Sequence, residues 1–254
     1  MKRGIYILTV KLAITGKGGS GKTTIVKAFM NIFEEKYPDK SILLFDNDLT
    51  SELAHSFGLD IRNTIYGIRS GKHEYKTGIP KDMTKSEYLE WALQDILVPI
   101  DDNVDIIESW FVGSKDCRCP ITKQINDAVY KLLNQYDFVI FDCEFDLKYL
   151  NQLVDTEIDC TLIVANPSEA SAHLAQRIKE FSLKHCAGNQ LGVIINKVDN
   201  SKMSTLSELL RKYDLDILGV IPYDKNLEDH VVDKNSEVVV NAIKTFYPRL
   251  NLPQ

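Results

Sequence analysis

The chain has 254 residues, of which 44% are hydrophobic and 26% are charged, and its formal net charge is −6. These proportions are those of an ordinary globular protein, and the negative charge disfavours a surface that coats nucleic acid. No apolar run reaches the roughly 20 residues that a membrane-spanning helix needs, so neither nucleic acid nor membrane is an expected partner. The five cysteines lack the even spacing of a disulfide framework. They predict free or metal-binding thiols in a cytoplasmic protein.

Short runs of β-branched and aromatic residues alternate along the chain with segments of helical period. This alternation is typical of a three-layer α/β fold, in which helices cover both faces of a mainly parallel sheet. We expect a single domain over residues 1–254, in which the weakly patterned stretch 58–99 is an insertion with one helix at 87–97. The predicted strands are 11–15, 41–46, 104–108, 138–142, 161–166, 192–196 and 217–221.

The segment Gly16–Thr24 reads GKGGSGKTT and fits the pattern G-x-x-x-x-G-K-[ST] between an apolar strand and an amphipathic helix. Glycines let successive backbone N–H groups point at phosphate oxygens, and the helix N-terminus adds favourable partial charge. The α/β fold is therefore expected to be that of a P-loop NTPase, with Lys22 reaching the β- and γ-phosphates and Thr23 ligating Mg²⁺. The nucleotide-binding residues predicted in this loop are Gly16, Gly18, Gly19, Ser20, Gly21, Lys22, Thr23 and Thr24.

Carboxylates follow two of the predicted strands. Asp46 and Asp48 end one strand two positions apart, and therefore lie on the same side of an extended segment, while Asp142 ends another. Phosphoryl transfer needs such groups to hold the metal and to position the attacking water. We expect Asp46 and Asp142 to bind Mg²⁺ together with Thr23, and Asp48 to orient the water.

The phosphate loop contains a second lysine, Lys17, which a phosphate-binding loop does not require. In this respect the loop resembles the deviant Walker A loop of the ATPase family that includes MinD, ParA and the nitrogenase iron protein. In that family the early lysine crosses a dimer interface to the nucleotide of the other subunit. The resemblance implies a homodimer that encloses ATP or ADP, with Lys17 acting on the partner's phosphates.

The loop GSKDCRCPIT places Cys117 and Cys119 one residue apart, so that both sulfurs can converge on one ion. Two thiolates leave a tetrahedral or square-planar metal half-filled, and a symmetric dimer would complete a Cys₄ site on its two-fold axis. Nickel or zinc is the expected metal. Because the same dimer would enclose the nucleotides, metal and nucleotide binding would be coupled.

This C-x-C pair on a nucleotide-binding chain resembles the CooC accessory ATPases, which help to insert nickel into carbon monoxide dehydrogenase. The resemblance covers nearly the whole chain, through DNDLTSELAHSFGL, CRC, IINKV and LGVIPYD. It implies a client enzyme like carbon monoxide dehydrogenase, and base contacts from Asn196, Lys197 and the Pro222 loop. The family pattern starts near Val10, which predicts that residues 1–9 are an N-terminal extension.

Two stretches depart from the family pattern. After Asp142 the family carries a glycine-bearing switch, whereas this chain has DCEFD, whose bulk and negative charge oppose close approach to a phosphate. We therefore predict slow hydrolysis. The stretch Asn196–Asp199 reads NKVD, like the guanine-reading motif of GTPases, so ATP and GTP both remain candidates, with ATP favoured by the deviant loop.

Other functions stay open at this point. A spatial regulator like MinD or ParA would carry a basic amphipathic tail or a basic stripe, and neither is present in the sequence. An electron carrier like the nitrogenase iron protein would hold a [4Fe–4S] cluster between two subunits. A nucleotide-binding scaffold without hydrolysis is consistent with the glycine-free switch.

Overall fold

The computed structural model describes residues 9–48, 50–70, 79–109, 120–144, 158–185, 188–199, 201, 203–227 and 236–252. Its centre is a single eight-stranded sheet with the strand order β3-β4-β2-β5-β1-β6-β7-β8. Neighbouring strands are parallel, except that β3 runs antiparallel to β4. The strands are β1 Val10–Gly16, β2 Ile42–Asn47, β3 Val98–Asp101, β4 Val104–Glu108, β5 Phe138–Cys143, β6 Ile158–Ala165, β7 Gly188–Val198 and β8 Ile217–Pro222.

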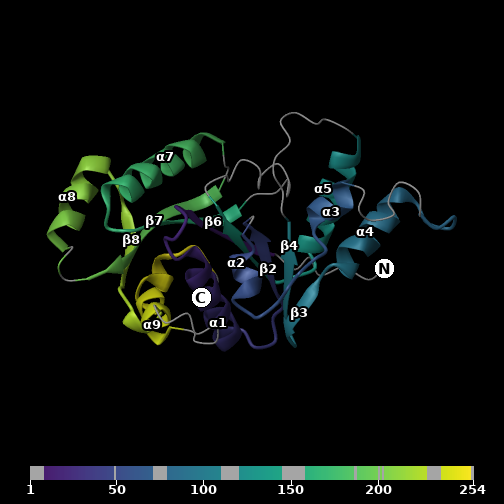
Figure 1. Ribbon diagram of the computed structural model, residues 1–254, viewed down its shortest axis with the longest axis horizontal. Helices are drawn as coiled ribbons and strands as arrows, with labels where there is room; N and C mark the ends of the chain where they lie inside the picture. Colours follow the sequence, from purple (N-terminus) through teal and green to yellow (C-terminus); the bar gives the residue numbers. More distant parts are fainter. Residues whose placement is uncertain are drawn as a thin grey trace.

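Helices cover both faces of this sheet, which confirms the predicted three-layer α/β fold (Figure 1). Helices α1, α2 and α9 pack on one face, and α3, α4, α5, α7 and α8 pack on the other. None of the helices in the described ranges is long and apolar enough to cross a membrane. The helices are α1 Lys22–Lys36, α2 Glu52–His55, α3 Ile65–Ser70, α4 Lys85–Asp95, α5 Pro120–Leu133, α7 Glu169–His185, α8 Met203–Tyr213 and α9 Glu237–Phe246.

Every predicted strand is present, and the helix expected at 87–97 is α4. This helix starts two residues earlier because Thr84 and Glu87 form a capping box, in which each side chain accepts a hydrogen bond from the other's backbone N–H. The edge strand β3 was not predicted, since its four residues are only half-buried and include Pro99. Proline cannot donate a ladder hydrogen bond and is tolerated in sheets at such an edge.

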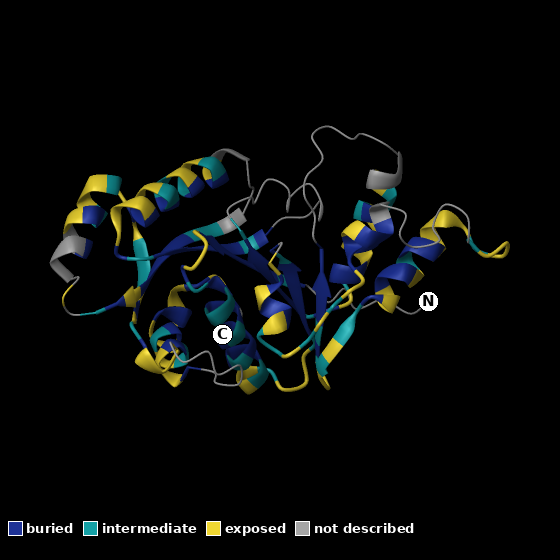
Figure 2. Cartoon of the chain, in the orientation of Figure 1, coloured by how far each residue is buried: buried dark blue, intermediate teal, exposed yellow. Residues whose placement is uncertain are grey.

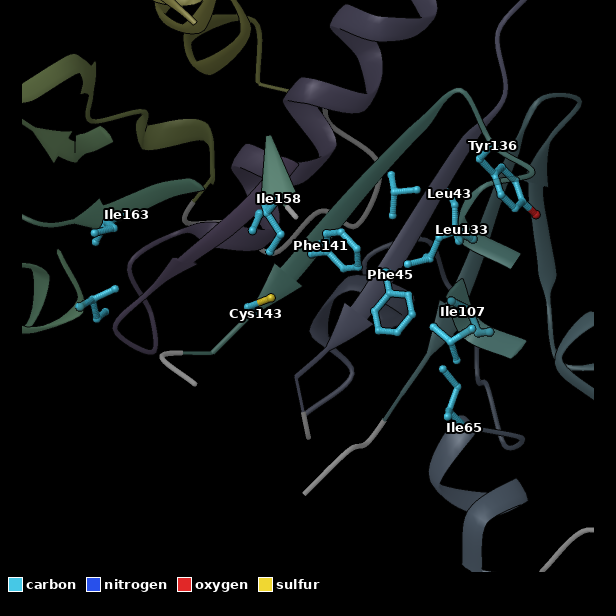
Figure 3. Packing of buried hydrophobic residues seen from close by; sticks show 14 of the residues in the cluster. Leu43, Phe45, Ile65, Ile107, Leu133, Tyr136, Phe141, Cys143, Ile158 and Ile163 are labelled. Carbon is cyan, nitrogen blue, oxygen red and sulfur yellow. The ribbon is translucent and has the colours of Figure 1, made fainter. Parts of the chain in front are cut away.

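Alternation along the strands decides which side chains reach which face. Leu43 and Phe45 of β2 pack with Phe141 of β5 and Ile107 of β4 on the face covered by α4 and α5 (Figure 3). The rings of Phe45 and Phe141 lie 5.2 Å apart between centroids. Because successive side chains point to opposite faces, the next residue along each strand is directed toward the α1 face. The central strands are buried along most of their length, whereas β3 and β8 are largely intermediate or exposed, and other exposed residues lie on the outer sides of the helices (Figure 2).

Candidate nucleotide and metal site

The phosphate loop connects the end of β1 at Gly16 to the start of α1 at Lys22. Gly16 has a φ of 150°, and a Cβ placed there would lie 2.2 Å from the carbonyl oxygen of Val164 on β6. Only glycine fits so close to a neighbouring backbone. Within the loop the Ser20 N–H donates to the Lys17 carbonyl over 3.0 Å, and no side chain caps the first turn of α1. The free N–H groups at a helix start are suited to an anion.

A row of carboxylates crosses the sheet beside this loop. In the strand register Asp46 of β2 lies opposite Asp142 of β5 on one side and Glu108 of β4 on the other. The exposed fractions of Asp46, Glu108 and Asp142 are 0%, 0% and 1%. By the alternation described above, all of them face the α1 side of the sheet. Burial of a carboxylate is costly unless a hydrogen-bond partner, a proton or a metal compensates for the lost water.

The start of α1 brings Thr23 and Lys22 to these acids. The Thr23 hydroxyl donates to Asp142 Oδ2 over 2.7 Å, and Lys22 Nζ lies 3.9 Å from Asp48 Oδ2. Lys22 is 5% exposed, so its ammonium group is held inside the site. Asp48 is fixed in turn, because its Oδ1 accepts hydrogen bonds from the N–H and the hydroxyl of Thr50.

The two strand-end aspartates have strongly perturbed acidities. Burial raises the pKa of Asp46 to about 8, and the nearby charges of Asp142, Glu108 and Asp48 add to the effect, against a hydrogen bond from the Asp48 N–H. Burial likewise raises the pKa of Asp142 to about 6, although the Thr23 hydroxyl and the Lys22 charge act in the opposite direction. Both shifts mean that negative charge is disfavoured here until a cation arrives.

The donor set fits Mg²⁺. Asp46 Oδ2 and Asp142 Oδ1 are buried and make no hydrogen bond in the structure, which leaves two hard oxygen ligands available beside the Thr23 hydroxyl. Among the described residues no group of three or more His, Cys, Asp or Glu side chains is placed to enclose a metal. Mg²⁺ commonly uses only one or two carboxylates together with water and phosphate oxygens, so this arrangement suits it.

Two side chains from the end of β7 donate hydrogen bonds to backbone carbonyls of the phosphate loop. Asn196 Nδ2 donates to the Ser20 carbonyl over 2.8 Å, and Lys197 Nζ donates to the Gly19 carbonyl over 2.9 Å. Lys197 itself adopts a left-handed φ of 59°. A Cβ on Gly21, whose φ is 93°, would lie 2.3 Å from Asn196 Nδ2. The loop carbonyls are therefore fixed outward, and glycine at position 21 permits the close approach.

A cavity of about 440 Å³ opens next to these two residues. Its size and its mixture of apolar and polar walls suit a nucleobase. Asp199, the guanine-reading position of an NKxD motif, does not line this cavity, and its Oδ1 accepts hydrogen bonds from the N–H and the hydroxyl of Ser201. The cavity is lined by Gly21, Thr24, Asn196, Lys197, Pro222, Tyr223, Asp224, Leu227 and Val239.

The structure thus gathers most of the predicted site residues at the carboxyl ends of the strands. The loop, Asp46, Asp48 and Asp142 lie around the expected phosphate position, and Asn196 and Pro222 line the cavity. Cys117 and Cys119 lie outside the described residues, as does the part of DCEFD after Glu144. Lys17 and Gly18 are exposed, and Lys17 forms no ion pair with any described residue.

Glu108 and part of the cavity wall were not predicted from the sequence. Glu108 had a usable signal, because the run VDIIE ends in an acid just as the neighbouring strands do. Of the remaining wall residues, Tyr223 and Asp224 belong to the predicted Pro222 loop, whereas Leu227 and Val239 had no signal, since they come from separate stretches further along the chain.

Residues 11–237 match the CobQ/CobB/MinD/ParA nucleotide binding domain. The chain belongs to this family. It is 26% identical over 222 residues to an uncharacterized ATP-binding protein of Methanocaldococcus jannaschii, covering 86% of this chain and 87% of the relative. It is 24% identical over 240 residues to the carbon monoxide dehydrogenase accessory protein CooC of Rhodospirillum rubrum, covering 86% of each.

Among solved structures, the MinC:MinD cell division protein complex of Aquifex aeolicus superposes with a TM-score of 0.67 at 18% identity, covering 97% of this chain and 98% of that one. At this level of identity the likeness concerns the fold. Together with the family match and the phosphate loop, it supports a nucleotide-binding domain of the CobQ/CobB/MinD/ParA family.

Proposed function

We propose that this protein is a Mg²⁺-dependent ATPase that binds nickel or zinc at a dimeric cysteine site and helps to insert nickel into an enzyme like carbon monoxide dehydrogenase. The observation that carries the ATPase part is the junction of α1 with the acidic row, where Thr23 donates to Asp142 and Lys22 approaches Asp48. The buried oxygens Asp46 Oδ2 and Asp142 Oδ1, which have no hydrogen-bond partner, are the expected Mg²⁺ ligands. Metal delivery rests on the Cys117/Cys119 pair and on the similarity to the CooC relative.

In this proposal each group at the strand ends has a distinct task. Lys22 binds the β- and γ-phosphates, while Thr23, Asp46 and Asp142 hold Mg²⁺, which when bound neutralises phosphate charge. Asp48 orients the attacking water, since its carboxylate is held by Thr50 and lies at the same edge as Lys22. Asn196 and Lys197 keep the loop open toward the phosphates.

The homodimer is also part of the proposal. Lys17 is exposed at the tip of the loop and forms no ion pair with a described residue, so its ammonium group is available for the phosphates of a second copy. The early-lysine loop of the MinD and ParA type suggests this role, in which Lys17 stabilises transition-state charge in the partner's site. Closure of the dimer would bring the Cys117/Cys119 pairs together on the two-fold axis.

The stretch DCEFD, which stands where the family has a glycine-bearing switch, is the basis for the expected slow hydrolysis of ATP. The Thr15 hydroxyl, which is buried at the end of β1, donates to the Glu144 carbonyl over 2.7 Å. Glu144 is therefore tied to the strand that leads into the phosphate loop, at a position where the family carries flexible residues. We infer that the switch moves slowly and that hydrolysis limits the rate of metal release.

Anaerobic metal titration with mass determination tests this function. The wild-type chain, Cys117→Ser/Cys119→Ser, and the control Cys160→Ala, whose thiol is buried in the core, are each titrated with Ni²⁺ and Zn²⁺. Each titration is run with and without a non-hydrolysable ATP analogue. We expect one metal ion per two chains and dimerisation in the wild type and the control, and loss of both in the double variant.

Unchanged metal binding and dimerisation in the double variant would contradict metal delivery. The ATPase would then stand as a nucleotide-switched regulator of the MinD or ParA kind with an unknown client. A brown colour with absorbance at about 400 nm would instead indicate an iron–sulfur cluster between the subunits.

A further inference from the structure

Two apolar walls of the base cavity come from separate parts of the chain. Val239 lies in the first turn of α9 and is buried, while Leu227 ends the 3₁₀ helix Lys225–Leu227 and is 37% exposed. Both side chains line the cavity. They can contact the same flat base only if the two segments that carry them keep a fixed spacing.

The Asp224 side chain joins these two segments. Its Oδ2 accepts the Ser236 hydroxyl over 2.6 Å, and its Oδ1 accepts the backbone N–H and the side-chain amide of Asn226 over 3.0 and 3.1 Å. Ser236 is the N-cap of α9, and its Oγ accepts the Val239 N–H over 3.2 Å. A series of hydrogen bonds therefore connects the loop that carries Leu227 to the backbone of Val239.

The Asp224 carboxylate is already used by the protein. Asp224 and Ser236 are 9% and 7% exposed, and both carboxylate oxygens accept hydrogen bonds from the chain itself. The Ser236 hydroxyl and the Asn226 N–H also lower the pKa of Asp224, so the group stays ionised at neutral pH. Hydrogen bonds to a charged acceptor are short and directional. The carboxylate is therefore suited to hold the cavity walls in place, and not to contact the base directly.

The far end of α9 is held by other contacts. The helix lies beside α1 and β8 (Figure 1). A Cβ at Gly219 of β8 would lie 2.1 Å from Phe246 Cδ1, so the Phe246 ring packs directly on the strand backbone. Ile243 and Phe246 are buried in the apolar cluster that includes α1. Loss of the Ser236 hydroxyl should therefore loosen the first turn of α9 and leave the rest of the helix in place.

We propose that the hydrogen bond between Asp224 and Ser236 fixes the spacing of the base-cavity walls and thereby makes the site selective for a purine nucleotide. Both are positioning residues, because they act through Leu227 and Val239. A purine covers more apolar wall than a pyrimidine, so walls at a fixed spacing favour the larger base. The inference rests on the proposed ATP binding and assigns the selectivity of that site to a named pair.

Competition binding tests this assignment on the full chain. ATP and CTP, each with Mg²⁺, displace a fluorescent ATP analogue from the wild type, from Ser236→Ala and from the control Ser86→Ala. Ser86 is exposed in the first turn of α4 and donates its hydroxyl to Glu90 over 3.1 Å, so the control also removes a hydroxyl–carboxylate bond at a helix start.

The ratio of the ATP and CTP affinities is the quantity that decides. We expect wild type and Ser86→Ala to bind ATP at least about tenfold more tightly than CTP, and Ser236→Ala to reduce this ratio about threefold or more. Asp224→Ala should reduce it as well. The loss in the double variant Asp224→Ala/Ser236→Ala should be smaller than the product of the two single losses, because both changes break one hydrogen bond.

An unchanged ratio in Ser236→Ala would overturn the proposal, and so would equal weakening of ATP and CTP, which is the result of a general loss of structure. If Asp224→Ala does not fold, Ser236→Ala decides the matter. Wild type that binds ATP and CTP equally well would overturn this inference and leave the ATPase standing. Wild type that binds no nucleotide would overturn both.

Discussion

Acidic residues at the two ends of the parallel strands differ in their hydrogen bonding. At the edge where β4, β5 and β6 begin, each carboxylate has a dedicated donor: Asp105 accepts the Tyr136 hydroxyl over 2.6 Å, and Asp159 accepts the Lys11 N–H over 2.8 Å. Asp137 accepts the Lys40 ammonium group over 2.8 Å and the Ser41 N–H over 3.0 Å. The acids at this end of the strands link neighbouring segments of the sheet through hydrogen bonds.

At the opposite end of the sheet, where β2 and β5 end, Asp46 and Asp142 are more deeply buried and each keeps one oxygen without a hydrogen bond. The carboxylates at the proposed ligand site are therefore those that keep a buried oxygen without a donor. The hydrogen-bonded acids raise the free energy of unfolding. The acids with an oxygen that has no donor lower it, and they are the ones positioned to bind a cation beside the phosphates. Perturbed acidity at the second edge has the same origin.

The largest effect should come from removing the Lys22 ammonium group, which lies among the buried acids at the ends of the strands. We expect Lys22→Ala to weaken ATP binding about 100-fold, because a buried charged donor to phosphate is lost. Titration with a fluorescent ATP analogue measures this change. Lys36→Ala, at the exposed far end of the same helix, is the control and should bind like the wild type; equal affinities for both variants would contradict the placement of the phosphates.

Substitutions at the two edges should change stability with opposite sign. Asp142→Asn removes a charge whose pKa is raised by burial and keeps an oxygen for the Thr23 hydroxyl. We expect it to raise the free energy of unfolding of the nucleotide-free protein by about 1–3 kcal/mol near neutral pH. Asp137→Asn weakens the hydrogen bonds from Lys40 and Ser41 and should lower it by about 1–2 kcal/mol.

Urea denaturation of both variants without nucleotide or divalent cation measures these two changes. Shifts of the same sign in Asp142→Asn and Asp137→Asn would show that the two edges do not differ in the way described. The wild-type protein with Mg²⁺ added serves as the reference for a neutralised acidic row.

The pH dependence of the free energy of unfolding should also differ between the acids at the two ends of the strands. An acid whose pKa is raised on folding contributes stability that is present below its unfolded pKa and is lost as the pH rises through its folded value. For Asp142 and Asp46 these folded values are about 6 and about 8, so the nucleotide-free protein should lose stability between about pH 4 and pH 8. Asp142→Asn should flatten the lower part of this slope.

Asp137 should behave in the reverse manner. Its burial tends to raise its pKa, but the hydrogen bonds from Lys40 and Ser41 outweigh burial, and the pKa is lowered overall. Its contribution is therefore present above the unfolded pKa of about 3.9 and disappears as the pH falls through the lower folded value. Denaturation curves in acid should show a shallower loss for Asp137→Asn than for the wild type.

The smallest effect should come from the hydroxyl that joins the loop to the acidic row. Thr23→Val keeps the shape of the side chain and removes the donor to Asp142. We expect about tenfold weaker binding of ATP in the presence of Mg²⁺ and little change in its absence. Titrations with and without the ion measure this difference, and a loss of equal size in both would place Thr23 on the phosphate instead of the metal.

Much of this organisation could be predicted from the sequence because its signals are local. The strands are continuous apolar runs, the glycine loop has a fixed spacing, and Asp46 and Asp142 immediately follow buried segments. The Asn196 and Lys197 contacts to the loop could not be predicted, since they join residues more than 170 positions apart. The raised pKa values likewise depend on register between strands, which a single strand does not reveal.

The Asn196 and Lys197 side chains line the base cavity and also hold the carbonyls of the phosphate loop. A ligand that fills the cavity therefore contacts the two groups that hold the loop, and a ligand that fills only the loop does not. The protein should consequently recognise the nucleotide as a whole. Inorganic triphosphate, which carries the same charges without the base, would bind more weakly than the missing base contacts alone would account for.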